Sequence, residues 1–124
     1  MGLDMYAFVS TSKPFKAVDV EEGDLENREL LHYWRKHPNL HGWMELLYRE
    51  KGGVGPEFNL HPVLLSESDL SRLEEVVRCG FLPQTSGFFF GKSDGSERED
   101  DLAFIAKARE ALRLGLTVGY IAWW

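Results

Sequence analysis

The sequence contains a single cysteine and no long apolar run, and each absence excludes a class of protein. Cys79 has no partner for an internal disulfide, so we expect a reducing environment and predict a cytoplasmic location. No apolar run reaches the ~18 residues that a membrane-spanning helix needs, so we predict no membrane partner. The first residues lack the basic segment and apolar core of a signal peptide, and we expect none.

Positive charge is also scarce, because 14 Lys and Arg stand against 20 Asp and Glu, giving a net charge of −6. Most non-specific affinity for nucleic acid comes from basic side chains that neutralise phosphates, so this balance argues against a nucleic-acid partner. The acids concentrate in segments 19–29 and 94–101, which we interpret as solvated helix starts. The alternative is an acidic surface that mimics DNA or binds a basic partner, which requires both segments on one face.

The short motifs that identify common enzymes are missing as well. There is no glycine-rich phosphate loop, no H-E-x-x-H zinc signature and no C-x-x-C pair. His37 and His41 have the i, i+4 spacing of a helical metal pair, but Pro38 lies between them and disrupts the helix. The sequence therefore predicts no metal site and no cofactor.

What the sequence does contain is the pattern of one α+β domain over residues 1–124. Alternating or aromatic apolar runs predict strands at residues 3–10, 63–65, 87–91 and 116–124. Apolar residues at helical spacing predict helices that start near residues 25, 38, 66 and 96. We expect a small, mostly antiparallel or mixed sheet of about three to four strands, covered by about four helices.

Three of these helix starts carry a capping signal. Asp24 precedes the first helix, where its carboxylate would accept hydrogen bonds from the first backbone N–H groups. Ser66 with Asp69, and Ser96 with Glu99, have the spacing of a capping box. These signals predict where the helices begin.

The segment 32–43, HYWRKHPNLHGW, holds three of the four histidines and two of the four tryptophans. His41 lies at the border of the buried stripe of its helix with Glu45 one turn away, a setting suited to a general acid or base. A half-buried histidine held by that carboxylate is the alternative. We expect surface or helix-end positions for His32 and His37.

The cations and aromatics of this segment are candidates for ligand binding. The forked donors of Arg35, beside Lys36, suit a carboxylate or a phosphate, and Trp34 or Trp43 could stack on a ring. The alternative places both tryptophans in the core and both cations in solvent. Asp4 is unusual within a strand and needs a partner if it is buried, for which Arg35 or His41 would serve; a structural ion pair is the alternative.

Three motifs also occur together in a group of known proteins. They are MGLDMY at the start, YWRKHPNLHGW in the middle and LPQTSGFFFG later, about 30 of the 124 residues. In these motifs the chain resembles a family of small bacterial and phage-encoded proteins without an established biochemical activity. Many of its members end close to Y-x-SSW, whereas this chain ends YIAWW. The resemblance singles out Asp4, Tyr6, Trp34, Arg35, Lys36, His41, Trp43, Ser86 and the run 88–90.

We expect the three motif segments to meet in space and form a polar pocket rimmed by aromatics, as small-ligand sites usually are. The first strand would supply Asp4 to it and the helix break would supply His41, the two candidate catalytic residues. The predicted ligand-binding residues are Tyr6, Trp34, Arg35, Lys36, Trp43, Thr85 and Ser86.

Two functions follow as hypotheses. The first is a binding or accessory protein of bacterial or phage origin that recognises a small anionic molecule or a host protein. The alternative is a small hydrolase-like or transferase-like enzyme, with His41 as acid or base and Arg35 as the anion clamp. The lack of an evident nucleophile or metal set favours the binding protein.

Overall fold

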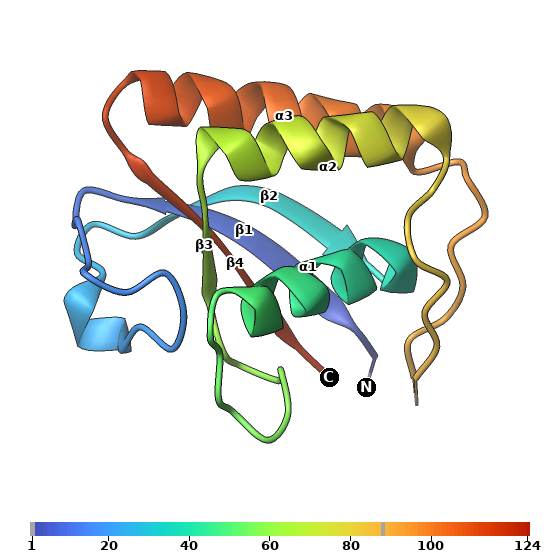
Figure 1. The fold of residues 1–124 in the computed structure, drawn as a ribbon, viewed down its shortest axis with the longest axis horizontal. Coiled ribbons are helices and arrows are strands. Elements are labelled where there is room, and N and C mark those ends of the chain that lie inside the picture. Colours follow the sequence, from blue (N-terminus) through green and yellow to red (C-terminus); the bar gives the residue numbers. More distant parts are fainter. Residues whose placement is uncertain (1, 88) are drawn as a thin grey trace.

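A computed structural model describes residues 2–87 and 89–124, which form one four-stranded antiparallel sheet and three α-helices (Figure 1). The strand order across the sheet is β2-β1-β4-β3. In chain order the elements are β1 (Asp4–Ser10), the 3-10 turn η1 (Glu22–Asp24), β2 (Glu29–Arg35), α1 (Pro38–Glu50), β3 (Val63–Leu65), α2 (Glu67–Cys79), α3 (Arg98–Arg113) and β4 (Thr117–Trp123). The predicted α+β class is confirmed, with one α-helix fewer than expected in the described part.

The sheet has two different faces, and the alternation of β1 defines them. Leu3, Met5 and Ala7 are fully buried in the core beneath the helices, on what we call the inner face. Asp4 and Tyr6 alternate with them and point to the opposite side, the outer face. In Figure 1, α2 and α3 run side by side along one edge of the view and α1 crosses nearer the termini. The main hydrophobic core therefore lies between the inner face and the helices.

Most predicted elements are present at the expected places. Ser66 caps α2, and its side chain and that of Asp69 form the predicted capping box. Gly80 ends α2 in a left-handed conformation with φ 72°, and Gly115 follows α3 with φ 85°. Pro38 begins α1, because a proline at the first helical position loses no intrahelical hydrogen bond.

The helix predicted from residue 25 to the proline is wrong. Residues 29–35 form β2, an edge strand that pairs antiparallel with β1. Asp24 belongs to η1, where its backbone N–H donates to Glu21 O at 2.9 Å, so it caps no helix. The apolar spacing that suggested a helix also fits a strand, since His32 and Trp34 face the core while Tyr33 points outward. Pairing with β1 decides between the two, because it satisfies the backbone groups of a half-buried segment.

Two smaller predictions also fail, in the segment between α2 and α3. Ser96 donates from Oγ to Asp94 Oδ1 at 2.6 Å instead of capping α3, whose N-cap residue Glu97 makes no side-chain cap. The described residues of the predicted strand 87–91 form a turn, in which Phe90 N–H donates to Gly87 O at 3.1 Å. Phe88 lies outside the described residues.

The outer face is covered at one end only. Phe8, Val20 and Leu25 form a second small core there, with Leu64 and Ile121 packed against it. None of these five residues belongs to a helix. The rest of the outer face carries no helix among the described residues. The two acidic segments lie at opposite ends of the view in Figure 1 and do not form a single acidic face.

Candidate functional site

Of the two partners expected for Asp4, Arg35 pairs with it, on the outer face. The two residues are register partners in β1 and β2, and Arg35 Nε lies 3.6 Å from Asp4 Oδ1. Tyr33 donates from its hydroxyl to the same oxygen at 2.5 Å, and this hydrogen bond raises the pKa of Tyr33. The Tyr33 ring packs on Tyr6 with 5.2 Å between centroids. The carboxylate is thus held at the rim of an aromatic surface, with one side open to water.

His41 lies on the other side of the sheet, inside the core. It is 1% exposed, and its Nδ1 is 2.6 Å from the Tyr120 hydroxyl. Tyr120 hydrogen-bonds it in place of the predicted Glu45. The rings of Phe58, Phe90 and Trp124 surround it, with centroid distances of 5.1, 5.3 and 4.8 Å. Burial lowers the pKa of His41 to about 4, so it is neutral near pH 7.

The structure does not bring His41 together with Asp4 and Arg35. Tyr120, the hydrogen-bond partner of His41, is the register partner of Ala7 on the inner face. Asp4 alternates with the inward residues of the same strand and faces the opposite side. The expected pocket that joins all three residues is therefore wrong, because the sheet itself separates them.

The remaining predicted residues divide between core and surface. Trp34 is buried and donates from Nε1 to Asp101 Oδ1 at 3.1 Å, so it is not available to a ligand. Trp43 is half-buried beside Arg72 in a surface hollow between α1 and α2. Lys36 has a left-handed backbone with φ 55° directly after β2, and its side chain is exposed.

The turn at 81–86 packs against α1 and not against the outer face. Thr85 lies so close to Gly42 that a Cβ at that glycine would meet the threonine Oγ1 at 1.9 Å. The backbone N–H of Thr85 also donates to Asn39 Oδ1 at 3.0 Å. Ser86 is exposed next to it. Thr85 thus packs against the first turns of α1, because only a glycine at position 42 leaves room for its side chain.

Sequence reasoning missed a polar cluster, the His37 network, which joins the starts of α1 and α3. His37 is 3% exposed, with Nε2 2.8 Å from Asp101 Oδ2 and Nδ1 2.7 Å from Ser93 Oγ. Asp101 is 1% exposed. His37 does lie at a helix end, as the N-cap residue of α1, but the expected surface position is wrong because the ring is buried. One signal was present: Asp101 falls on the buried stripe of α3 with Phe104 and Ile105, and a buried acid needs a partner.

His32 is the other histidine for which a surface or helix-end position was expected, and it is buried as well. Its ring packs 4.5 Å from Trp34 and 5.8 Å from Phe104. Nε2 lies 3.0 Å from Asp100 Oδ1, but the two groups are not aligned for a hydrogen bond. His32 thus completes the inner face of β2 and has no evident chemical role.

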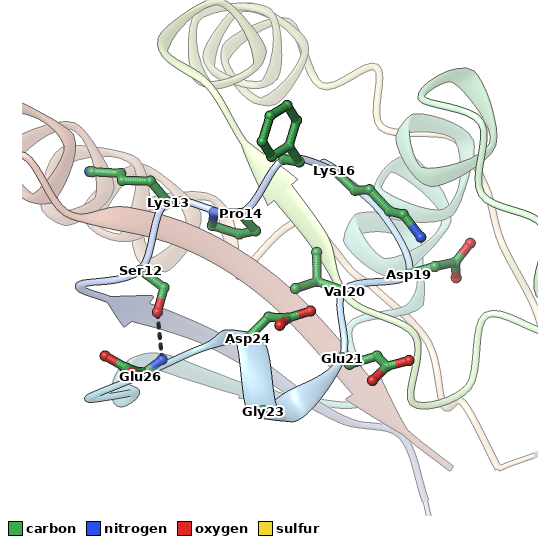
Figure 2. A pocket seen from close by; sticks show the side chains of 11 residues that line it. Ser12, Lys13, Pro14, Lys16, Asp19, Val20, Glu21, Gly23, Asp24 and Glu26 are labelled. Atoms are coloured by element: carbon green, nitrogen blue, oxygen red, sulfur yellow. Dashed lines mark hydrogen bonds between the residues drawn. The ribbon is translucent and has the colours of Figure 1, made fainter.

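A hollow of about 620 Å³ is lined by the loop at residues 12–26 (Figure 2). Lys13 and Lys16 lie on the upper limb of this loop in Figure 2, and Glu21 and Asp24 lie on the lower limb. The lining as a whole holds two lysines and four acids, Asp19, Glu21, Asp24 and Glu26, so the hollow is net acidic and disfavours an anion. No group of acids, histidines and cysteines within residues 2–87 and 89–124 is arranged to hold a metal ion.

The uncovered part of the outer face forms an apolar groove of about 330 Å³, which we call the outer groove. Leu30, Leu60 and Trp123 flank it and are 64%, 59% and 57% exposed, and Tyr33 beyond it is 44% exposed. The full lining is Tyr6, Phe8, Arg28, Glu29, Leu30, Leu60, Ile121, Ala122 and Trp123. Large apolar side chains gathered on one surface of a soluble domain commonly mark a binding site.

Helices long and apolar enough to cross a membrane do not occur in the described part of the chain. The resemblance to the small bacterial and phage-encoded family remains a prediction. A scan against protein-family models found no match, and searches of curated proteins and of solved structures found no significant match.

Proposed function

We propose that the protein is a binding module that holds a segment of a partner protein in the outer groove. The observation that carries this proposal is the concentration of exposed Leu30, Tyr33, Leu60 and Trp123 on a sheet face that no described helix covers. Aromatic and aliphatic anchors of this kind supply most of the affinity at protein interfaces.

The charges around the outer groove are balanced. Arg28 lies over the ring of Phe8, 5.7 Å from its centroid, and Glu29 lines the groove next to it. Arg35 is paired with Asp4 on the same face. The exposed apolar side chains would therefore supply most of the affinity, and the charged groups around them would position polar groups of the partner.

The alternative function, an enzyme that uses His41 with Arg35, finds no support in the geometry. The two residues lie on opposite sides of the sheet, and the imidazole is enclosed by aromatic rings. An acid or base must reach the proton that it transfers, which a fully enclosed ring does not.

Photo-crosslinking in cells tests the proposal. A photoreactive phenylalanine analogue is placed at Trp123 or Tyr33, and at Phe15 as a control that is fully exposed away from the outer groove. We expect a discrete crosslinked species from the first two positions and none from Phe15. Identical patterns from all three positions, or no product at Trp123 and Tyr33, would contradict a partner site here. Mass spectrometry of the product distinguishes a second copy of this chain from a different protein.

A further inference from the structure

A serine, a histidine and an aspartate stand in line where α1 and α3 begin. Ser93 Oγ lies 2.7 Å from His37 Nδ1, and His37 Nε2 lies 2.8 Å from Asp101 Oδ2. We propose that this line is a nucleophilic site at which Ser93 accepts the acyl group of a small ester. The site belongs to the inner side of the molecule and does not rest on the binding function of the outer groove.

The hydrogen bonds around Asp101 set the protonation of the histidine. Asp101 is buried, and its Oδ1 accepts the indole N–H of Trp34 at 3.1 Å. Its Oδ2 faces His37 Nε2, and a carboxylate can only accept there, so the ring proton is assigned to Nε2. The lone pair of Nδ1 is then directed at Ser93. An oriented base beside a hydroxyl is the arrangement that activates a serine.

The surroundings of Ser93 also favour the loss of its proton. The backbone N–H of Asn39, in the first turn of α1, donates to Ser93 Oγ at 3.1 Å. This N–H and the positive end of the helix dipole stabilise negative charge on the oxygen. Glu97 Oε2 lies 3.9 Å from His37 Nδ1, where it would stabilise the imidazolium that forms when the proton arrives.

A hollow of about 330 Å³ opens beside this line and can admit a small substrate. Ser93 is half-buried and lines the hollow together with His37. Val77 and Leu82 form an apolar wall suited to a short acyl chain, while Arg98 supplies a positive charge to the lining. Shape and lining therefore favour a small acyl ester.

The reaction uses only the ester and water. Ser93 Oγ attacks the carbonyl carbon, its proton passes to His37 Nδ1, and the same proton is donated to the departing alcohol. Water then attacks the acyl-serine, giving one proton to Nδ1, and this proton returns to Ser93 as the carboxylic acid leaves. Asp101 keeps its contact with His37 Nε2 throughout and acts as a positioning residue.

A fluorophosphonate probe tests the site, because an activated serine displaces its fluoride and remains covalently labelled. We expect the folded, full-length protein to take up the probe at Ser93, identified by peptide mass spectrometry. We also expect p-nitrophenyl acetate to release a burst of about one equivalent of nitrophenolate. No adduct on Ser93 in the folded parent protein would overturn the proposal, whatever the variants do.

Matched variants separate activation of Ser93 from simple exposure. Ser93→Ala should abolish labelling, whereas Ser96→Ala, on the same loop with its hydroxyl bonded to Asp94, should label at the parental rate. His37→Gln, tested after circular dichroism shows that it is folded, should label at least about a hundredfold more slowly. An unchanged rate in that variant, or equal labelling of Ser96, would overturn the proposal.

The pH profile tests the positioning role of Asp101. In the Asp101→Asn variant the amide N–H₂ can donate to Nε2, which moves the ring proton to Nδ1 and removes the base from Ser93. The labelling rate should then lose its plateau near neutral pH and rise only with hydroxide concentration. A purely structural role would lower the melting temperature and leave the shape of the profile unchanged, and that result would count against the proposal.

Discussion

The inner and outer faces of the sheet use the same kinds of residue in opposite ways. On the inner face, His41, His37 and Asp101 are buried, and each meets a specific hydrogen-bond partner. On the outer face, Asp4 and Tyr33 meet in a pair that water reaches. The difference teaches that enclosed polar residues in this domain are held in place by one another, whereas those of the outer face are open to water and available to a partner protein.

Removing one aspartate from each face should give the largest difference in the free energy of unfolding. Asp101→Ala removes the hydrogen-bond partner of His37 Nε2 and of the Trp34 N–H in the core, so we expect a loss of about 3–5 kcal/mol in the free energy of unfolding. Asp4→Ala breaks a pair that is open to solvent, and we expect a loss below about 1 kcal/mol. Urea unfolding of both variants measures the difference, and equal losses would remove the distinction between the faces.

The pH dependence of stability tests the enclosure of His41. Its pKa falls from 6.5 in the unfolded chain to about 4 in the fold, so the unfolded state binds more protons between these values. Stability from this group is complete above pH 6.5 and should fall by about 3 kcal/mol as the pH drops to 4. His41→Phe should flatten this part of the curve. If the unfolding free energy of the parent protein does not change between pH 6.5 and 4, the His41 ring is hydrated in the folded state.

Two residues of β4 allow the two faces to be compared on a single strand, with smaller expected effects. Tyr120→Phe removes only the hydroxyl that His41 meets in the core, and we expect a loss of about 1–2 kcal/mol in unfolding free energy. Thermal unfolding of the variant provides the measurement. No change would mean that water replaces this hydroxyl.

Trp123→Ser, on the outer face of the same strand, should have the smallest effect on stability. Its side chain is 57% exposed, so we expect a change within about 0.5 kcal/mol. The same substitution should abolish the crosslink formed from Tyr33. A large loss of stability would instead make Trp123 part of the core.

The sequence allowed the correct prediction of elements whose signals are local. The alternation of β1, the proline that starts α1 and the Ser66–Asp69 capping box each act within a few residues. The strand β2 was missed because its leucines and Trp34 fit a helical stripe equally well. Only its pairing with β1, which is a long-range contact, decides in favour of a strand.

The candidate sites depended on such long-range information even more. An acid in a strand needs a partner nearby, which gave Arg35 and His41 as candidates for Asp4, and the structure selects Arg35. His41 lies on the inner side of the sheet because α1 covers that face. No local sequence pattern shows which face of a sheet a helix covers. Asp101 on the apolar stripe of α3 could have indicated the buried partner of His37, but the loop residue Ser93 gave no signal.

Hydroxyl-radical footprinting in cells and on the purified protein is the most direct test of the division between the faces. Oxidation of Tyr33 and Trp123 is compared with that of Phe15 and Phe81, which are exposed outside the outer groove. We predict that Tyr33 and Trp123 are protected in cells, while Phe15 and Phe81 are oxidised equally in both settings. Equal oxidation of all four residues in cells and in the purified protein would contradict a partner on the outer face.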